Sequence, residues 1–267
     1  MMTPLVGITS YNRRDLLWET LNALFLTTEH SAFELVVVDN GSTDGSPQLL
    51  REYPYPRELG SMIEGDDLLL LPDNIGCPLA LNRMLAHRKR GQPFVKVDND
   101  VQVLTHGWVE RMARFEETHP DAAMIGAYYD GVLGPDDCRK HGETEDAGHP
   151  SDAYVVDLLP GHFVWHTGSF LDRVGYFDVL APNHLYGFED WIMCQKAACL
   201  DKKVYVLQDV EMRNIQDVKS YAPIGGQDKD SHVEAMRPFY RARLKALADG
   251  RAELYTPPSG QPFMKGG

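Results

Sequence analysis

The strongest constraint on the fold is an alternation of short apolar runs with segments of helical periodicity. Residues 5–9, 34–38, 67–71 and 94–97 are runs of strand-like length, and the segments between them carry apolar residues at helical spacing. The second run is apolar almost throughout, as parallel strands covered on both faces are. The repeated strand–helix order predicts an α/β fold, with a mainly parallel central sheet and helices on both faces.

The second half of the chain continues this pattern less regularly. Strands are expected near residues 122–128, 154–159 and 203–207, and a last helix over 233–248. Polar segments rich in glycine or proline separate these elements. We expect a surface loop at 130–152, a mobile loop at 216–232, and a loose tail or docking arm at 251–267.

The bulk composition limits the classes of function. A net charge of −13 over 267 residues argues against broad electrostatic binding to nucleic acid, which needs a basic footprint. No apolar stretch is long enough to span a bilayer, and the start of the chain lacks the basic and apolar regions of a signal peptide. The four cysteines show no metal-ligand spacing, so thiols in a reducing cytoplasm are expected: Cys77, Cys138, Cys194 and Cys199.

Two carboxylates follow the fourth apolar run directly. Asp98 and Asp100 flank Asn99, and at a strand end, where the chain turns, both side chains can converge on one point. Hard oxygen ligands of this kind suit Mg²⁺ or Mn²⁺. Open α/β sheets bind ligands beyond the carboxyl ends of their strands, which favours a metal site here. An acidic turn without a metal is the alternative.

Polar residues also follow the second and third runs. Asp39 can accept a hydrogen bond from a nucleotide base, and Gly41 lets the backbone approach a ligand, although a plain turn into the next helix is equally consistent. Ala80 and Asn82 lie near the start of a helix that begins at about Pro78, and a helix N-terminus is a natural anion site.

Taken in order, the motifs resemble those of the family 2 glycosyltransferases, which have the GT-A fold. The matching segments are Thr9-Ser10-Tyr11-Asn12, Val38-Asp39-Asn40-Gly41-Ser42-Thr43-Asp44, Asn74-x-Gly76-x-x-x-Ala80-x-Asn82, Asp98-x-Asp100 and Tyr186-Gly187-Phe188-Glu189-Asp190. The resemblance covers roughly residues 4–215. It implies a transferase domain over 1–215, with a donor half to about residue 105 and an acceptor half over 106–215. Residues 216–267 then form a mobile loop, a helix and a tail.

The resemblance also implies roles for individual residues. The residues that match donor-binding positions of the family are Thr9, Tyr11, Asp39, Asn40, Asn74, Gly76, Ala80, Asn82, Asp98 and Asn99. Asp98 and Asp100 match the Asp-x-Asp motif that holds Mn²⁺ or Mg²⁺ on the diphosphate. Asp190 matches the catalytic base of inverting members, and Glu189 matches a residue that binds the acceptor or orients the base.

The chain departs from the pattern at the third metal ligand. Many GT-A enzymes place a histidine after the last strand, whereas residues 209–214 here contain none. Either Asn214 or Glu211 is therefore expected as a substitute, or metal binding is expected to be weaker. Retaining enzymes also share this fold, so inversion is not fixed by the fold alone.

Two other functions are alternatives to a glycosyltransferase. A sugar-1-phosphate nucleotidyltransferase shares the metal and the nucleotide fold, but its glycine-rich triphosphate loop is missing after the first run. A degenerate carbohydrate-binding module would tolerate loss of the acidic residues, and all of them are present. Uridine diphosphate sugars are favoured as donors over guanosine diphosphate mannose. The acceptor stays open among a glycan, a small molecule, a protein and a modified nucleic-acid base.

Overall fold

The computed structural model describes residues 2–28, 33–55, 68–129, 153–215 and 229–262. The predicted surface loop at 130–152 and most of the predicted loop at 216–232 lie outside these residues.

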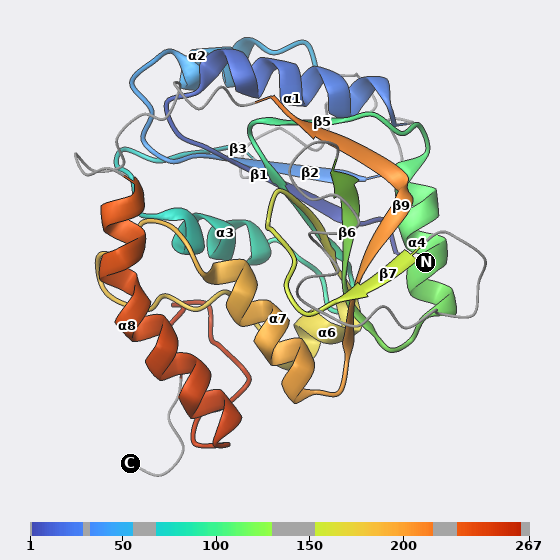
Figure 1. Ribbon diagram of the computed structural model, residues 1–267. Coiled ribbons are helices and arrows are strands. Elements are labelled where there is room, and N and C mark those ends of the chain that lie inside the picture. The colour runs from blue at the N-terminus through green and yellow to red at the C-terminus, as the bar shows by residue number, and fades with distance from the viewer. Residues whose placement is uncertain (1, 29–32, 56–67, 130–152, 216–228, 263–267) are drawn as a thin grey trace.

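The described strands form one mixed sheet, shown in Figure 1. Their order is β3-β2-β1-β4-β8-β6-β9-β5, and β7 pairs with β9. Neighbours among β3, β2, β1 and β4 run parallel, whereas β8 runs antiparallel to both β4 and β6. The predicted α/β fold with parallel strands is confirmed: the first four strands are parallel, and β6 also runs parallel to β9, whereas β5 and β7 run antiparallel to β9. The bounds are β1 Leu5–Ser10, β2 Glu34–Asp39, β3 Leu68–Leu70, β4 Phe94–Asp98, β5 Val101–Val103, β6 Ala122–Tyr129, β7 Ala153–Val156, β8 Phe163–His166 and β9 Lys203–Asn214.

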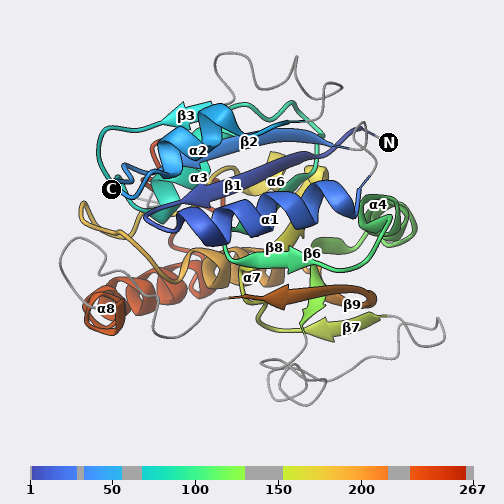
Figure 2. The ribbon, with the colours of Figure 1, turned by 90° about the horizontal axis from the view of Figure 1, so that it is seen from above.

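Helices cover both faces of the sheet, as the alternating pattern predicts. Apolar residues of α1, α2 and α4 join one buried core with the sheet, and those of α3, α6 and α7 join a second core on the opposite face. The last helix, α8, packs against α7 rather than on the sheet (Figures 1 and 2). The bounds are α1 Arg14–Leu26, α2 Ser46–Glu52, α3 Cys77–Leu85, α4 Trp108–Thr118, α6 Gly168–Val174, α7 Glu189–Cys199 and α8 Lys229–Ala248.

The carboxyl-terminal segment is docked over residues 251–262, which agrees with the expected docking arm and not with the alternative of a loose tail. The Thr256 N–H donates to the Val174 carbonyl at 2.9 Å, and the Tyr176 N–H donates back to the Thr256 carbonyl at 2.9 Å. α8 also begins at Lys229 rather than at residue 233. The predicted boundary at residue 215 stays a prediction, and the contacts of this segment with α6 and α7 cross it.

A buried ionic network fixes this segment to the sheet domain. Asp178 accepts from Lys196 of α7 at 2.7 Å and from Arg243 of α8 at 2.5 Å, and the Thr256 hydroxyl also donates to it. The side chains of Asp178 and Lys196 are fully buried. Burial alone would raise the pKa of Asp178, but the two cations outweigh burial and hold this pKa below its usual value.

We expect Asp178→Asn to lower the free energy of unfolding by about 3–5 kcal/mol, because two buried cations would then face a neutral amide. Urea denaturation followed by circular dichroism measures this change. Because the folded pKa of Asp178 lies below its unfolded value of about 3.9, the network stabilises fully above that pH, and its contribution is lost on further acidification. Asp249→Asn is the control, since its pair with Arg251 is exposed and should be worth under about 0.5 kcal/mol. Equal unfolding free energies for the two variants would contradict the network's role.

Candidate active site

Predicted site residues from distant parts of the sequence converge at the carboxyl ends of β1, β2 and β4. A cavity of about 140 Å³ opens there. A larger groove of about 500 Å³ lies beside α1 and α2, but none of the predicted residues lines it. The smaller cavity is therefore the candidate site, at the place where open α/β sheets bind ligands. Its lining residues are Thr9, Tyr11, Arg13, Asn40, Asn74, Cys77, Asp98, Asn99, Asp100, His162, Leu185, Tyr186 and Lys229.

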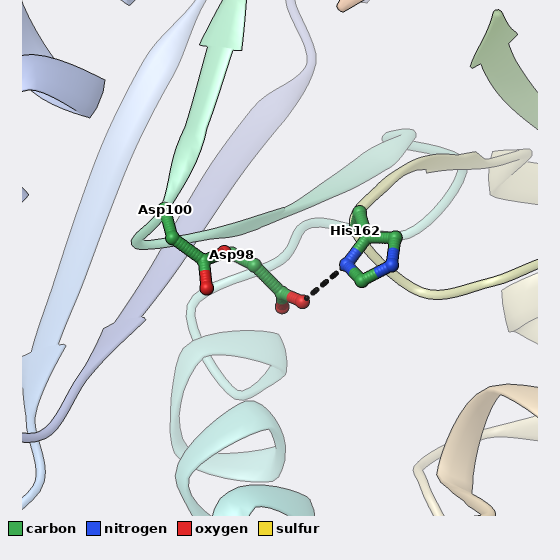
Figure 3. Close-up of side chains that lie close together, drawn as sticks. All are labelled: Asp98, Asp100 and His162. Carbon is green, nitrogen blue, oxygen red and sulfur yellow. Dashed lines mark hydrogen bonds and ion pairs between the residues drawn. The ribbon is translucent and has the colours of Figure 1, made fainter. Parts of the chain in front are cut away.

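A turn between β4 and β5 carries the two aspartates of the Asp-x-Asp motif. His162 lies beside them because β8 runs antiparallel to β4, so that the Asp98 N–H donates to the His162 carbonyl at 2.9 Å. His162 Nδ1 is 3.3 Å from Asp98 Oδ2 (Figure 3). Ligand atoms of Asp98, Asp100 and His162 all lie within 4.8 Å of one another. This aspartate–histidine group has the carboxylate and imidazole donors that suit a divalent metal ion.

The two aspartates of the group differ in their charge environment. Asp100 Oδ2 pairs with Arg13 Nη1 at 2.5 Å, whereas Asp100 Oδ1 is buried and has no hydrogen-bond partner among the described residues. Burial and the charge of Asp98 raise the pKa of Asp100. Burial acts on Asp98 in the same direction, but Lys96 and His162 outweigh it and lower the pKa of Asp98 to about 2. A buried oxygen without a partner is costly, which fits a role as a metal ligand.

A second polar region lies at the ends of β1 and β2. Asp39 is fully buried, and its Oδ1 accepts from the Ser42 N–H at 2.9 Å. Asp39 Oδ2 and Thr9 Oγ1 are buried without a hydrogen-bond partner in the described part of the chain. Burial raises the pKa of Asp39. Tyr11 lines the cavity at the same strand ends. These acceptor atoms suit the N–H and hydroxyl groups of a nucleoside.

The segment before α3 is held by a pair of asparagines. Asn40 Nδ2 donates to Asn74 Oδ1 at 2.9 Å, and the N–H groups of Ile75 and Gly76 donate to Asn40 Oδ1 and Asn74 Oδ1. Gly76 has φ +90°, and a Cβ there would lie 2.3 Å from the His184 carbonyl oxygen. Only glycine fits this approach of two chain segments. The two predicted asparagines therefore shape the cavity wall.

The acid pair at the start of α7 is buried and connected to β4. Phe188, which precedes the pair, adopts the left-handed conformation with φ +70°. Asp190 Oδ2 accepts from Lys96 Nζ at 2.7 Å, and the same ammonium is 3.5 Å from Asp98 Oδ1. Burial raises the pKa of both Glu189 and Asp190; the charge of Asp190 raises that of Glu189 further, and Lys96 opposes the shift at Asp190.

Seven of the predicted site residues are not among those that line the cavity: Asp39, Gly76, Ala80, Asn82, Glu189, Asp190 and Asn214. Ala80 is fully buried in the core beneath α3. Asn82 is also buried, where its side chain donates to the Phe177 carbonyl and accepts from the Phe177 N–H. Asn214, predicted as a third metal ligand, lies at the end of β9 opposite Val101. The structure places His162 beside the two aspartates instead.

Four basic residues at the site were not predicted. His162 comes near Asp98 only through antiparallel pairing, which the strand–helix pattern does not indicate. Arg13 and Lys229 line the cavity, and Lys229 Nζ lies 3.9 Å from the centroid of the Tyr186 ring. Lys96 left a visible signal, because it is the one charged residue inside the apolar run 94–97.

The fold and the site together define a class. A GT-A glycosyltransferase has this arrangement: parallel strands with an Asp-x-Asp motif at their carboxyl ends, followed by an antiparallel strand and a buried acid pair. The model of the family described as Glycosyl transferase family 2 matches residues 5–177. The chain therefore belongs to glycosyltransferase family 2.

Individual relatives agree with this assignment. The poly(ribitol-phosphate) beta-N-acetylglucosaminyltransferase TarS of Staphylococcus aureus is 27% identical over 216 residues, which cover 78% of this chain and 35% of TarS. Its solved structure with UDP-GlcNAc gives a TM-score of 0.57 at 20% identity, covering 93% of this chain and 71% of that one. The mannosyltransferase PcManGT of Pyrobaculum calidifontis, solved with GDP-Man and Mn²⁺, gives a TM-score of 0.62 at 19% identity, covering 92% and 75%.

The chain spans about a third or less of the length of the curated relatives it matches. Across the described ranges, none of the helices combines the length and the apolar character needed to cross a membrane.

The aspartate–histidine group predicts which side chains bind metal. We expect Asp100→Ala and His162→Ala each to weaken Mn²⁺ binding by about 10-fold or more, because each removes one ligand. Isothermal titration with Mn²⁺ in the presence of UDP measures the affinity. Asn214→Ala is the matched control and should leave it unchanged. If Asn214→Ala bound Mn²⁺ more weakly and His162→Ala bound it as tightly as the wild-type protein, the third ligand would be Asn214 instead.

Proposed function

We propose that the chain transfers a sugar from a nucleoside-diphosphate sugar to an acceptor hydroxyl, with a divalent metal ion and with inversion of the anomeric centre. One observation carries this proposal. Asp98 of the aspartate–histidine group and Asp190 of the acid pair share a single buried cation, the ammonium of Lys96. A donor-binding carboxylate and a candidate base therefore lie within reach of one substrate.

The donor we propose is a uridine diphosphate sugar. Asp39 Oδ2 supports this, since it has no hydrogen-bond partner among the residues that the structure describes and can accept the N–H of a base. Thr9 and Tyr11 line the cavity nearby and could contact the ribose. TarS, solved with UDP-GlcNAc, supports uridine, whereas PcManGT, solved with GDP-Man, makes guanosine the alternative.

Asp98, Asp100 and His162 would hold the metal ion, and Mn²⁺ or Mg²⁺ fits their donor atoms. When bound, the ion neutralises the negative charge that develops on the leaving diphosphate. Arg13 and Lys229 line the same cavity and add positive charge toward the phosphates. Arg13 pairs with Asp100, so its guanidinium lies directly at the metal-binding carboxylate.

Asp190 is the proposed general base. An acceptor hydroxyl has a very high pKa, so a carboxylate must take its proton as the new bond forms. Asp190 Oδ2 is occupied by Lys96, while Asp190 Oδ1 has no hydrogen-bond partner among the described residues and can accept that proton. Attack from the face opposite the diphosphate then inverts the anomeric carbon. Glu189, buried beside it, would bind the acceptor or orient Asp190.

We further propose that residues 106–215 supply most of the acceptor side and that the start of α8 completes it. Tyr186 and Lys229 support this placement, because they line the cavity from the segment before α7 and from the first turn of α8.

A thermal-shift panel tests the proposed function. It compares UDP, GDP, their sugars and the corresponding triphosphates, each with Mn²⁺ and with a chelator. A ligand at about 100 times its dissociation constant stabilises by about 2.7 kcal/mol, which raises the unfolding midpoint measurably. Stabilisation by one diphosphate only with metal is expected. Stabilisation by triphosphates alone would favour a nucleotidyltransferase. If no nucleotide shifted the unfolding midpoint, a binding module would be favoured.

We expect Asp190→Asn to lower the transfer rate by about 100-fold or more while the affinity for UDP and Mn²⁺ stays nearly unchanged, because only the proton acceptor is lost. Rates of UDP release and a UDP titration measure the two quantities. Asp209→Asn is the control, since its carboxylate makes an exposed pair with Arg111. Equal loss of rate and of donor affinity in Asp190→Asn would exclude the role of base.

A further inference from the structure

Lys96 is an unusual residue for its position. It lies in the middle of β4, between Val95 and Val97, and is 3% exposed. Burying an ammonium group is costly unless it is paired and hydrogen-bonded. The strand therefore places a charge where an apolar residue would serve the fold at least as well, since apolar replacement of buried ion pairs is often neutral or stabilising.

The partners of Lys96 come from both sides of the site. Its Nζ donates to Asp190 Oδ2 at 2.7 Å and lies 3.5 Å from Asp98 Oδ1. Asp98 ends β4, whereas Asp190 belongs to α7, which is far away in the sequence. One ammonium thus sets the distance between the first aspartate of the Asp-x-Asp motif and the proposed base.

The contact also selects one oxygen of Asp190. Because Oδ2 is held by Lys96, the rotation of the carboxylate is restricted, and Oδ1 is left as the oxygen without a hydrogen-bond partner in the described part of the chain. A base that presents one defined oxygen avoids the reorientation that a freely rotating carboxylate would need.

A third segment closes around the same pair. A Cβ at Gly161 would lie 1.7 Å from Asp190 Oδ2 and 2.3 Å from Lys96 Nζ. Any side chain at this position would displace the ion pair. The loop before β8 therefore has no side chain at the one place where Lys96 and Asp190 meet.

We propose that Lys96 is a positioning residue for the catalytic base, an inference that rests on the proposed function. The ammonium holds the Asp190 carboxylate in one orientation, which leaves Oδ1 as the oxygen for the acceptor. It acts through Asp190 and does not itself exchange a proton with the substrate. Its main effect is therefore on the rate of transfer, and the longer contact of 3.5 Å with Asp98 Oδ1 leaves only a small effect on the binding of nucleotide.

A double-mutant cycle tests this inference on the full chain. The variants are Lys96→Met, Asp190→Asn and the two combined, and the readouts are the dissociation constant of UDP with Mn²⁺ and kcat for UDP release from the UDP-sugar, with water as the acceptor. Lys96→Met should lower kcat about 100-fold and change the UDP affinity by less than about threefold. The combined variant should be no slower than Asp190→Asn, because Lys96 acts only through the base.

The combined variant also protects the test against misfolding. Lys96→Met alone leaves Asp190 buried without its cation, whereas the combined variant removes both charges of the pair. Additive losses of kcat in the combined variant would overturn the inference, and so would a Lys96→Met variant with the kcat of the wild-type protein.

Lys196→Met is the matched control. Lys196 is also fully buried, also pairs with an aspartate at 2.7 Å and lies on the same helix as Asp190. It should lose stability and keep the wild-type kcat below its unfolding midpoint. An equal loss of kcat in Lys196→Met would mean that Lys96→Met acts through a general loss of structure, and it would overturn the inference. A wild-type protein that neither binds UDP or GDP nor releases it from a nucleotide sugar would overturn the proposed function, and this inference with it.

Discussion

The antiparallel pairing of β4 with β8 is the constraint on which the site depends. The first four strands are parallel and would alone present a nucleotide pocket with two aspartates at their carboxyl ends. Because β8 runs in the opposite direction, the loop before it returns to the same ends of the strands, and the Asp98 N–H donates to the His162 carbonyl. Through this reversal the imidazole of His162 reaches Asp98, and the backbone of Gly161 reaches Lys96 and Asp190.

Buried charge is then distributed over two separate networks. Lys96 neutralises carboxylates on either side of the reaction site, whereas Asp178 gathers Lys196, Arg243 and Thr256 beneath α7. Both networks contact the same helix, one at its first turn and one at its carboxyl-terminal half. The acid pair is therefore placed by a helix that is anchored at two points, which suits the proposed role of Asp190 as a base in a fixed position.

Much of the site could be predicted because strand ends in an α/β sheet collect functional groups. Asp98 and Asp100 could be placed in this way from local pattern alone, whereas Asn74 is assigned through the family resemblance. Other predictions carried a family position onto a residue whose surroundings the sequence does not reveal: Asn82 hydrogen-bonds the backbone of Phe177, and Asn214 lies opposite Val101. His162 could not be found at all, since antiparallel pairing between distant strands leaves no periodic signal in the chain.

The strand order also has a consequence for how the molecule assembles. The parallel block of β1 to β4 is continuous in sequence, so it can form while later residues are still being synthesised. β9 inserts between β6 and β5, and Thr256 bonds to Val174 only after nearly the whole chain exists. Contacts between such distant residues form slowly. We therefore expect the first four strands to fold early and the helix that carries Asp190 to be secured last.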